Sequence, residues 1–271
     1  MHMSVEDVSV TFTRAGSTVD ALKDVDLSLR EGEFVALLGP SGCGKSTLLT
    51  CMGGLMAPTQ GQIVVDGQAV ASPDPRRAAF VFQDYSLLPW KNVLDNVGIG
   101  LRFAGVGKQE RRERSQELLS MMGLAQWADS HPDRLSGGMQ QRVAVARALA
   151  MSPSILLMDE PFGALDEQTR RALGESISMV LTQNKQTVVL VTHSLDEAIY
   201  WADRVIVMSA RPGRIIAEVQ VSRPRPRPLG FIAESDFAEL RAQLFELLDE
   251  AMNHDAATLE AGGDIAEPTK A

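Results

Sequence analysis

The chain of 271 residues is poor in the residue types that mark disulfide-linked, metal-bound or nucleic-acid-binding proteins. Its two cysteines, Cys43 and Cys51, are too few for a disulfide framework, and its four histidines form no metal-ligand pattern. Lys and Arg number 26 against 35 Asp and Glu, which gives a formal net charge of −9. Because sequence-independent binding to DNA or RNA needs clustered positive charge, this balance argues against a nucleic-acid partner.

Long apolar runs are also missing. No stretch approaches the roughly 18 apolar residues that a membrane span requires, and the N-terminus lacks a basic region followed by an apolar signal core. The hydrophobic share of 45% and the charged share of 23% are ordinary for a globular protein. We therefore expect a soluble cytoplasmic protein, for which any work at a membrane requires partner chains.

The order of apolar patterns predicts an α/β fold. Residues 4–13 and 25–29 alternate like half-buried strands, and Asp66-Gly67 fits the turn of a hairpin. Elsewhere short apolar runs, of the kind buried in a parallel sheet, alternate with helical patterns. These runs cover residues 34–38, 79–82, 155–158, 187–192 and 205–208. We expect a mostly parallel sheet with extra antiparallel strands near the N-terminus.

Helical patterns divide the chain further. Helices are expected over residues 46–55, from 167, over 195–202 behind a Ser194/Glu197 capping box, and as an amphipathic helix over 237–251. We expect residues 1–222 to form the main domain, with a helical subdomain inserted at about 88–150. Residues 223–271 would then form a stiff linker of alternating Arg and Pro, the amphipathic helix and a frayed polar tail.

Residues 39–46, Gly-Pro-Ser-Gly-Cys-Gly-Lys-Ser, match the phosphate-loop pattern G-x-x-x-x-G-K-[ST] between an expected strand and helix. The glycines let backbone N–H groups face phosphate oxygens, and the helix N-terminus adds partial positive charge. Lys45 is placed to bridge the β- and γ-phosphates, Ser46 to ligate Mg²⁺ and Thr47 to contact a further phosphate. The alternative is a glycine-rich turn without a ligand. The residues expected at the nucleotide are Gly39, Pro40, Ser41, Gly42, Cys43, Gly44, Lys45, Ser46 and Thr47.

Two acidic residues follow the apolar run 155–158. The run pushes Asp159 and Glu160 to the carboxyl edge of the sheet, where ligands bind in such folds. Asp159 would hold Mg²⁺ through water, and Glu160 would polarise an attacking water. Such a run often marks only a strand that meets solvent. Beside a phosphate loop, however, the pair indicates nucleotide hydrolysis.

Residues 135–142, Leu-Ser-Gly-Gly-Met-Gln-Gln-Arg, distinguish among the families that carry a phosphate loop. The Ser136 hydroxyl and the Gly137 and Gly138 amides begin a helix and offer a second anion site. This run resembles the signature motif of ATP-binding-cassette (ABC) ATPases, which implies a RecA-like P-loop core over about residues 4–220. The resemblance also implies a head-to-tail homodimer, or a paired ATPase, in which the signature of one subunit closes over ATP held by the other.

Four further positions match landmarks of that family. Gln83 resembles the Q-loop glutamine that reaches Mg²⁺ and the attacking water, and Asp166 resembles the D-loop residue that crosses the dimer. His193 resembles the switch histidine that contacts the γ-phosphate. Phe12 stands where the family places an aromatic ring on adenine, although a phenylalanine in the core of a strand is the alternative. The resemblance thus implies Glu160, His193 and Gln83 as catalytic residues, and Ser46, Gln83 and Asp159 as Mg²⁺ ligands.

A free-standing cassette without a membrane span resembles the ATPase subunit of bacterial importers. That arrangement implies a place on the cytoplasmic face of the inner membrane, with two permease subunits and an external solute-binding protein as an indirect partner. Residues 84–90 suit the apolar socket that a permease helix needs, since they include Leu87, Leu88 and Trp90. The alternative is that these side chains pack inside the helical subdomain.

The importer branch that the chain most resembles serves nitrate, taurine and aliphatic sulfonates. The resemblance rests on residues 87–90, 161–166 and 211–215. Two other classes of function stay open. One is an ABC ATPase that acts on nucleic acid, which the acidic balance opposes, and the other is a pure binding or regulatory module, which Glu160 and His193 oppose.

Overall fold

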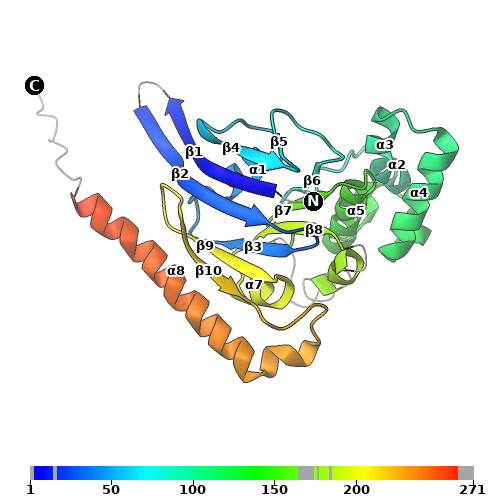
Figure 1. Cartoon of the computed structure of the whole chain (residues 1–271). Coiled ribbons are helices and arrows are strands. Elements are labelled where there is room, and N and C mark those ends of the chain that lie inside the picture. The colour runs from blue at the N-terminus through cyan, green and yellow to red at the C-terminus, as the bar shows by residue number, and fades with distance from the viewer. Residues whose placement is uncertain (1–2, 15–16, 164–173, 176, 183–184, 262–271) are drawn as a thin grey trace, which may run out of the picture.

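The computed structural model describes residues 3–14, 17–163, 174–175, 177–182 and 185–261, and it consists of two sheets and the helices around them (Figure 1). The larger sheet has the order β10-β9-β3-β8-β7-β6, and the smaller sheet has the order β2-β1-β4-β5. In the larger sheet every described pairing is parallel except that of β10 with β9. The predicted α/β core with an antiparallel N-terminal sheet is therefore confirmed. The strands of the larger sheet are β3 (Phe34–Leu38), β6 (Ala78–Val81), β7 (Ile155–Asp159), β8 (Thr187–Val191), β9 (Arg204–Met208) and β10 (Ile215–Gln220).

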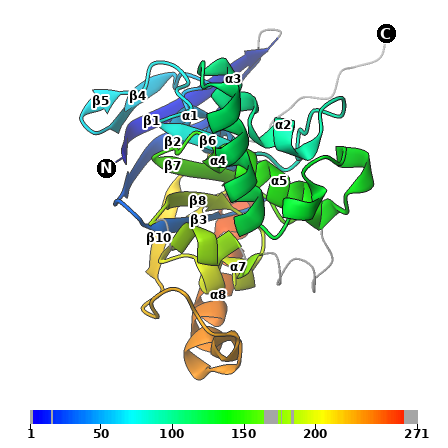
Figure 2. The ribbon, with the colours of Figure 1, turned by 90° about the vertical axis from the view of Figure 1, so that its right-hand side faces the viewer.

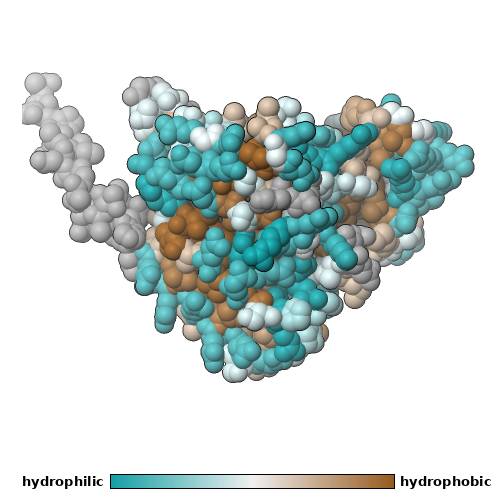
Figure 3. Space-filling model, in the orientation of Figure 1, coloured by the Kyte–Doolittle hydropathy of each residue, from teal (hydrophilic) through white to brown (hydrophobic). Residues whose placement is uncertain are grey.

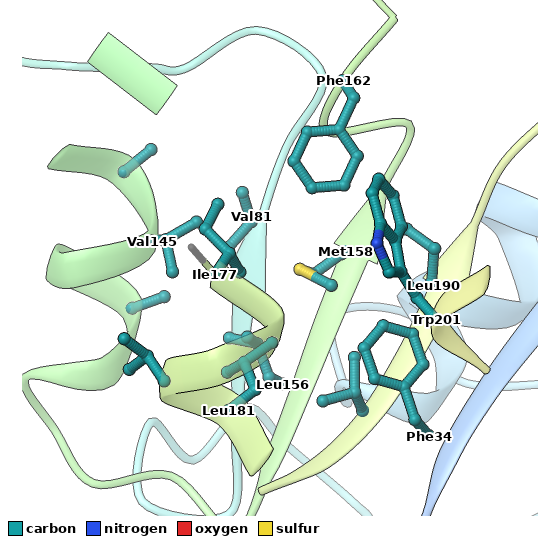
Figure 4. Close-up of a cluster of buried hydrophobic side chains, with 14 of the residues drawn as sticks. Phe34, Val81, Val145, Leu156, Met158, Phe162, Ile177, Leu181, Leu190 and Trp201 are labelled. Atoms are coloured by element: carbon teal, nitrogen blue, oxygen red, sulfur yellow. The ribbon is translucent and has the colours of Figure 1, made fainter. Parts of the chain in front are cut away.

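The larger sheet is buried on both faces, as its unbroken apolar strands require. Along β3, Phe34, Ala36 and Leu38 belong to one hydrophobic cluster, whereas Val35 and Leu37 belong to another on the opposite face. Figure 4 shows the first cluster, in which Phe34 and other strand side chains meet side chains of the helices. The two clusters cover both faces of the sheet, so a ligand can reach the sheet only at an edge, such as the one formed by the carboxyl ends of its parallel strands.

The smaller sheet consists of β1 (Met3–Arg14), β2 (Ser17–Leu29), β4 (Gln60–Val65) and β5 (Gln68–Ala69). The predicted hairpin at Asp66-Gly67 is confirmed by the antiparallel pairing of β4 with β5. The prediction of a strand limited to residues 25–29 was wrong, because β2 begins at Ser17. Residues 17–20 are all exposed, so they carry no buried alternation, and backbone pairing with β1 alone extends the hairpin.

Helix α1 (Lys45–Met52) follows β3 and packs between the two sheets, since its buried side chains share a cluster with β1 and β2. The other face of the larger sheet is covered by inserted helices beside β6 and by helices nearer the C-terminus beside β3 and β9 (Figure 2). No helix among the described residues is long and apolar enough to cross a membrane. The inserted helices are α2 (Val93–Val97), α3 (Ile99–Phe103), α4 (Lys108–Met121) and α5 (Gly137–Leu149), with short 3-10 turns at Ala125–Trp127 and Pro132–Arg134.

Helix α7 (Leu195–Trp201) begins at the predicted cap. The Ser194 hydroxyl accepts a hydrogen bond from the backbone N–H of Glu197 at 3.2 Å. Glu197 Oε2 also accepts a hydrogen bond from the Thr192 hydroxyl at 2.5 Å. The Thr192 hydroxyl in turn accepts from the backbone N–H of Ser194 at 3.1 Å. The helix start is thus tied to the end of β8.

Residues 223–228, predicted as an extended linker, lie against the core. Arg225 is largely buried and forms two hydrogen bonds with the Asp203 carboxylate, at 2.9 and 2.8 Å. Arg227 donates to the backbone carbonyls of Ile199 and Tyr200 at the end of α7, at 3.0 and 2.9 Å. Burial lowers the pKa of Arg227 to about 10. The arginines therefore attach the C-terminal region to the larger sheet and to α7.

The last helices are the 3-10 turn η3 (Leu229–Ala233) and α8 (Ser235–Ala261). Phe237, Leu244 and Ala251 of α8 are buried, which confirms the predicted amphipathic helix. Helix α8 runs to Ala261 and so extends into the part of the tail that was expected to fray. It passes along the edge of the larger sheet that β9 and β10 form (Figure 1).

Candidate functional site

A cleft of about 760 Å³ lies where the phosphate loop, the end of β7 and the smaller sheet meet. Nine of the site residues that the sequence predicts line it, whereas Gly39, Pro40, Cys43, Gln83 and Asp159 are not among its described lining residues. The cleft therefore joins one apolar wall, from β1 and β2, to a polar floor at the carboxyl edge of the larger sheet. Its lining residues are Phe12, Ser17, Val19, Ala21, Ser41, Gly42, Gly44, Lys45, Ser46, Thr47, Glu160, His193 and Arg211.

The phosphate loop, residues 39–46, joins β3 to α1, and a glycine at its end allows the backbone to turn tightly into the helix. Gly44 precedes the helix with a φ of 103°, a conformation that side chains rarely adopt. A Cβ on Gly44 would lie 2.6 Å from Leu22 Cδ2 and 2.8 Å from the Ala21 carbonyl oxygen, so β2 packs directly on the loop. The smaller sheet thereby holds the loop in the shape that presents its N–H groups to a ligand.

Lys45 is only 5% exposed, yet its charge has no carboxylate partner among the residues that the structure describes. Its Nζ atom donates to the carbonyl oxygens of Gly39 and Pro40 at 2.7 and 2.8 Å, and lies 3.7 Å from Cys43 Sγ. A buried cation held only by neutral groups gains most from an incoming anion. The loop is thus arranged as an anion-binding site.

Ser46 and Asp159 meet across the cleft floor. Ser46 Oγ donates to Asp159 Oδ1 at 3.0 Å, which joins the start of α1 to the end of β7. Burial raises the pKa of Asp159, and the negative charge of Glu160 raises it further, while the Ser46 hydrogen bond and the charges of Lys45 and His193 oppose the shift. Mg²⁺ prefers oxygen ligands, and the Ser46 hydroxyl and the Asp159 carboxylate place two such ligands side by side.

Glu160 and His193 form the second polar pair. His193 Nε2 lies 2.5 Å from Glu160 Oε1, and Glu160 adopts a φ of 45°, a strained conformation of the kind that gathers at functional sites. A Cβ on Gly163 would lie 3.9 Å from both Gln83 Nε2 and Glu160 Oε2. Gln83, Glu160 and His193, which the sequence predicts to act together, are therefore brought together.

Phe12 lies on the apolar wall of the cleft and is 47% exposed. The alternative that Phe12 is a core residue of its strand is therefore wrong, since a core position would bury the ring. The exposed ring and Val19, which pairs with Phe12 across the β1–β2 hairpin, give the cleft an apolar surface. Such a surface suits a flat base or another planar group.

The predicted signature residues lie elsewhere. Ser136 caps α5 by accepting a hydrogen bond from the backbone N–H of Met139 at 3.4 Å, so the predicted helix start is present. Ser136, Gly137 and Gly138 are absent from the described lining of the cleft. Asp166, the predicted D-loop residue, lies outside the described residues.

Some side chains of the predicted permease socket pack inside the helical region, and others are exposed, so each of the two alternatives holds for part of the segment. Leu87 and Tyr85 pack against the hydrophobic cluster of the helical region. Trp90, in contrast, is 72% exposed, and Phe103 of α3 is 84% exposed. Figure 3 shows hydrophobic residues on the surface of the region that contains α2 and α3. The segment thus has an inner side that packs and an outer side that is free in this chain.

Four lining residues were not predicted from the sequence. Ser17, Val19 and Ala21 belong to the part of β2 that the pattern did not indicate, and Arg211 comes from the loop between β9 and β10. The resemblance to the importer branch includes residues 211–215 but implies no role for Arg211. No sequence signal marks the three residues of β2, because residues 17–20 are all exposed and show no alternation of buried side chains.

Comparisons with known proteins agree with this geometry. The sequence model described as "ABC transporter" matches residues 22–163. The taurine import ATP-binding protein TauB of Rhizobium johnstonii is 46% identical and spans 91% of this chain and 96% of its own length. The nitrate import ATP-binding protein NrtD of Synechococcus elongatus is 41% identical over 92% of each chain.

Solved structures of ATP-binding cassettes are also similar to this chain. A dimeric post-hydrolysis structure of the ATP-binding cassette MJ0796, bound to ADP and Pi, has a TM-score of 0.73 and 35% identity. The match covers 82% of this chain and 100% of that one. The chain belongs to the ABC transporter family and is one of its ATP-hydrolysing cassettes.

Proposed function

We propose that this protein is the nucleotide-binding subunit of a bacterial ABC importer and hydrolyses ATP to drive uptake of a small anionic or zwitterionic solute. Nitrate, taurine or an aliphatic sulfonate is the proposed cargo, because relatives at 41% and 46% identity are named for nitrate and taurine import. In this proposal residues 1–222 form the ATPase domain, with the helical subdomain at about 88–150. Residues 223–271 form a C-terminal extension.

The observation that carries the proposal is the arrangement of Lys45, Ser46, Glu160 and His193 around one cleft. Lys45 supplies a buried charge, without a carboxylate partner among the described residues, for the phosphates, and Phe12 supplies an apolar surface for adenine. ATP would lie with its base on the Phe12 wall and its γ-phosphate toward Glu160. Glu160 would orient the attacking water and accept its proton, while the β–γ bridging oxygen departs with ADP.

His193 and Gln83 complete this constellation. His193 hydrogen-bonds to Glu160 in the described structure, so it can hold the carboxylate in position and donate to a γ-phosphate oxygen once ATP enters. Gln83 Nε2 and Glu160 Oε2 both lie near Gly163, so the Gln83 amide could orient the same water. Because Gln83 begins the segment that leads into the helical region, it also joins the reacting centre to the proposed permease socket.

The oxygen donors of Ser46 and Asp159 fit Mg²⁺. Their 3.0 Å separation places two hard ligands side by side, and the described residues hold no group of three or more His, Cys, Asp or Glu that would favour another metal. Mg²⁺ is usually held by one or two protein oxygens together with phosphates. Ser46 and Asp159 would hold the ion, with Gln83 as the third proposed ligand, and the ion would neutralise charge on the β- and γ-phosphates.

A second copy of the chain is needed to complete each site. The signature helix start at Ser136 carries a capped N-terminus, which is a ready anion site, yet it is apart from the cleft of its own chain. In a head-to-tail dimer Ser136 and Gly138 of one subunit would close over the γ-phosphate bound by the other. The dimeric cassette of known structure supports this arrangement.

The proposed location is the cytoplasmic face of the bacterial inner membrane, where two permease subunits would bind the ATPase dimer. The exposed Trp90 and the neighbouring apolar surface support a socket for a permease helix. Closure of the dimer around two ATP would draw both sockets together and turn the transport pathway outward. An external solute-binding protein would then act through the permeases alone.

Replacement of the proposed base tests the cycle. Glu160→Gln keeps the size of the side chain but cannot accept the proton, so the variant with Mg-ATP should elute as a dimer on size-exclusion chromatography. The matched control is the wild-type chain with ADP, which should elute as a monomer. A Glu160→Gln chain that stays monomeric at saturating ATP would contradict the sandwich dimer.

Growth tests identify the cargo. A strain without the gene should fail to grow on nitrate as sole nitrogen source, or on taurine or an alkanesulfonate as sole sulfur source. Wild type should restore growth on the one affected solute, and Glu160→Gln should not. Normal growth on all three, in a strain without a redundant transporter, would contradict the proposed cargo and leave the ATPase assignment unchanged.

A further inference from the structure

The loop between β9 and β10, residues 209–214, reaches the nucleotide cleft beside the phosphate loop. Arg211, at the tip of this loop, lines the cleft together with Gly42 and Phe12. None of the roles proposed above involves the loop. The cleft therefore has two cationic side chains among its described lining residues, Lys45 and Arg211.

The loop is fixed to both the phosphate loop and the smaller sheet. A Cβ on Gly213 would lie 1.9 Å from the Cys43 carbonyl oxygen, so the two backbones touch at this glycine. The Gly213 N–H donates to the Ala21 carbonyl at 2.9 Å, and the Gly213 carbonyl accepts from the Lys23 N–H at 3.0 Å. Its conformation is therefore set by neighbours on two sides.

The base of the loop is closed as well. The Ser209 N–H donates to the Arg214 carbonyl at 2.9 Å, and the Arg214 N–H donates to the Ser209 hydroxyl at 3.0 Å. The Ala210 N–H donates to the carbonyl of Ala251 in α8 at 3.3 Å. Arg211 is thus presented from a closed, well-anchored turn, and little ordering of backbone is needed when a ligand arrives.

The Arg211 guanidinium keeps donors free. Its Nε and Nη2 atoms both donate to one acceptor, the Gly42 carbonyl, at 3.3 and 3.1 Å. No carboxylate pairs with Arg211 among the residues that the structure describes, whereas Arg214 in the same loop pairs with Asp24 at 2.9 Å. A guanidinium has five N–H donors, so Arg211 has donors left for a ligand in the cleft that it lines.

We propose that Arg211 is a further nucleotide-binding residue, which donates to the phosphate chain of the bound nucleotide. A guanidinium matches phosphate oxygens in geometry and charge. Contact with the phosphates is favoured over stacking on the base, because Arg211 is attached to the phosphate-loop backbone and forms no cation–π contact with Phe12 in the described structure. The inference rests on the proposed function and adds a second cation to its site.

Titration calorimetry of the full chain with Mg-ATP, on Arg211→Gln and Arg211→Lys, tests the proposal. Arg211→Gln should weaken binding about tenfold, the loss that one charge-assisted hydrogen bond supports. Arg211→Lys, which retains the charge but not the fork, should fall between Arg211→Gln and wild type. The matched control is Arg214→Gln, from the same loop but outside the cleft, which should bind Mg-ATP like wild type. Thermal melting of each variant confirms that it is folded.

Two comparisons separate the possible results. Lys45→Met should abolish binding; if it binds Mg-ATP normally, the cleft is not the nucleotide site and the proposed function fails. If Lys45→Met loses binding while Arg211→Gln does not, only the role of Arg211 is overturned. With Mg-GTP, Arg211→Gln should lose affinity by the same factor, since a phosphate contact is independent of the base. A loss confined to ATP would show that Arg211 reads the base and would overturn the phosphate assignment.

Discussion

The variant Gly213→Ala adds one methyl group where the loop 209–214 contacts the phosphate loop, so it tests whether that contact supports the phosphate loop. A Cβ there would lie 1.9 Å from the Cys43 carbonyl oxygen and 3.2 Å from Leu22 Cδ2. Ordinary contacts between such atoms are longer than about 3 Å, so one backbone must move by about 1 Å. Overpacking of this kind costs about 1–3 kcal/mol of stability.

The displaced atom belongs to the loop that binds the phosphates, so the larger effect should appear in function. A misplacement of about 1 Å costs about 100-fold in catalysis, and we expect Gly213→Ala to lower kcat/KM for ATP by about this factor. ATPase assays of the assembled transporter and urea unfolding of the isolated chain measure the two effects. We expect the functional loss to exceed what the loss of stability explains.

Gly230→Ala is the matched control, since a Cβ at Gly230 would meet nothing within 4 Å. This variant should retain wild-type stability and activity. If Gly213→Ala also melts and hydrolyses ATP like wild type, then the loop 209–214 does not support the phosphate loop. The reasoning from the close approach of the two backbones would then be refuted.

Three further predictions concern single side chains. Asp159→Asn should raise the melting temperature of the nucleotide-free chain at pH 7.5. Because the folded-state pKa of Asp159 is raised, the ionised carboxylate destabilises the fold above that pKa, and asparagine removes this charge. At acid pH, where the carboxyl group is protonated, melting scans of Asp159→Asn should show no gain over wild type. Arg225→Ala should lower the free energy of unfolding in urea by about 2–4 kcal/mol, because the Asp203 carboxylate loses its bidentate partner. Phe12→Ala should weaken Mg-ATP binding by calorimetry about 5- to 10-fold, the worth of one stacking contact, while Phe12→Trp should retain it.

Each of these predictions has an outcome that contradicts it. A melting temperature of Asp159→Asn that is equal to or below that of wild type at pH 7.5 would mean that burial does not penalise the carboxylate. Wild-type stability of Arg225→Ala would show that the Arg-Pro segment is a loose linker after all. If Phe12→Ala binds Mg-ATP as tightly as wild type, the base lies elsewhere in the cleft.

The features that the sequence predicts well are those fixed by short-range chemistry. The run of residues 39–46 admits few conformations, and the apolar run before Asp159 leads to one edge of a sheet. Both motifs therefore meet in the structure as expected, with Ser46 and Asp159 3.0 Å apart. The same is true of His193, which follows a buried strand and reaches Glu160.

The features that the sequence does not predict depend on contacts between distant segments. Arg211 is 169 residues from Gly42, and no local pattern indicates that the two meet. Arg225 and Arg227 have the composition of a solvated linker, but bonds to Asp203 and to the carbonyls at the end of α7 hold them on the core. Charged side chains can bury when fixed partners exist, and only the folded chain shows those partners.

The separation of Ser136 from the cleft of its own chain has a genetic consequence. In the proposed dimer each site joins the Lys45 loop of one subunit to the Ser136 helix of the other. A Lys45-defective chain and a Ser136-defective chain are each inactive alone, because both of their sites are damaged. When the two are expressed together, every mixed dimer has one site with two intact halves and one site with none. Complementation between two dead alleles is thus built into the placement of a single helix.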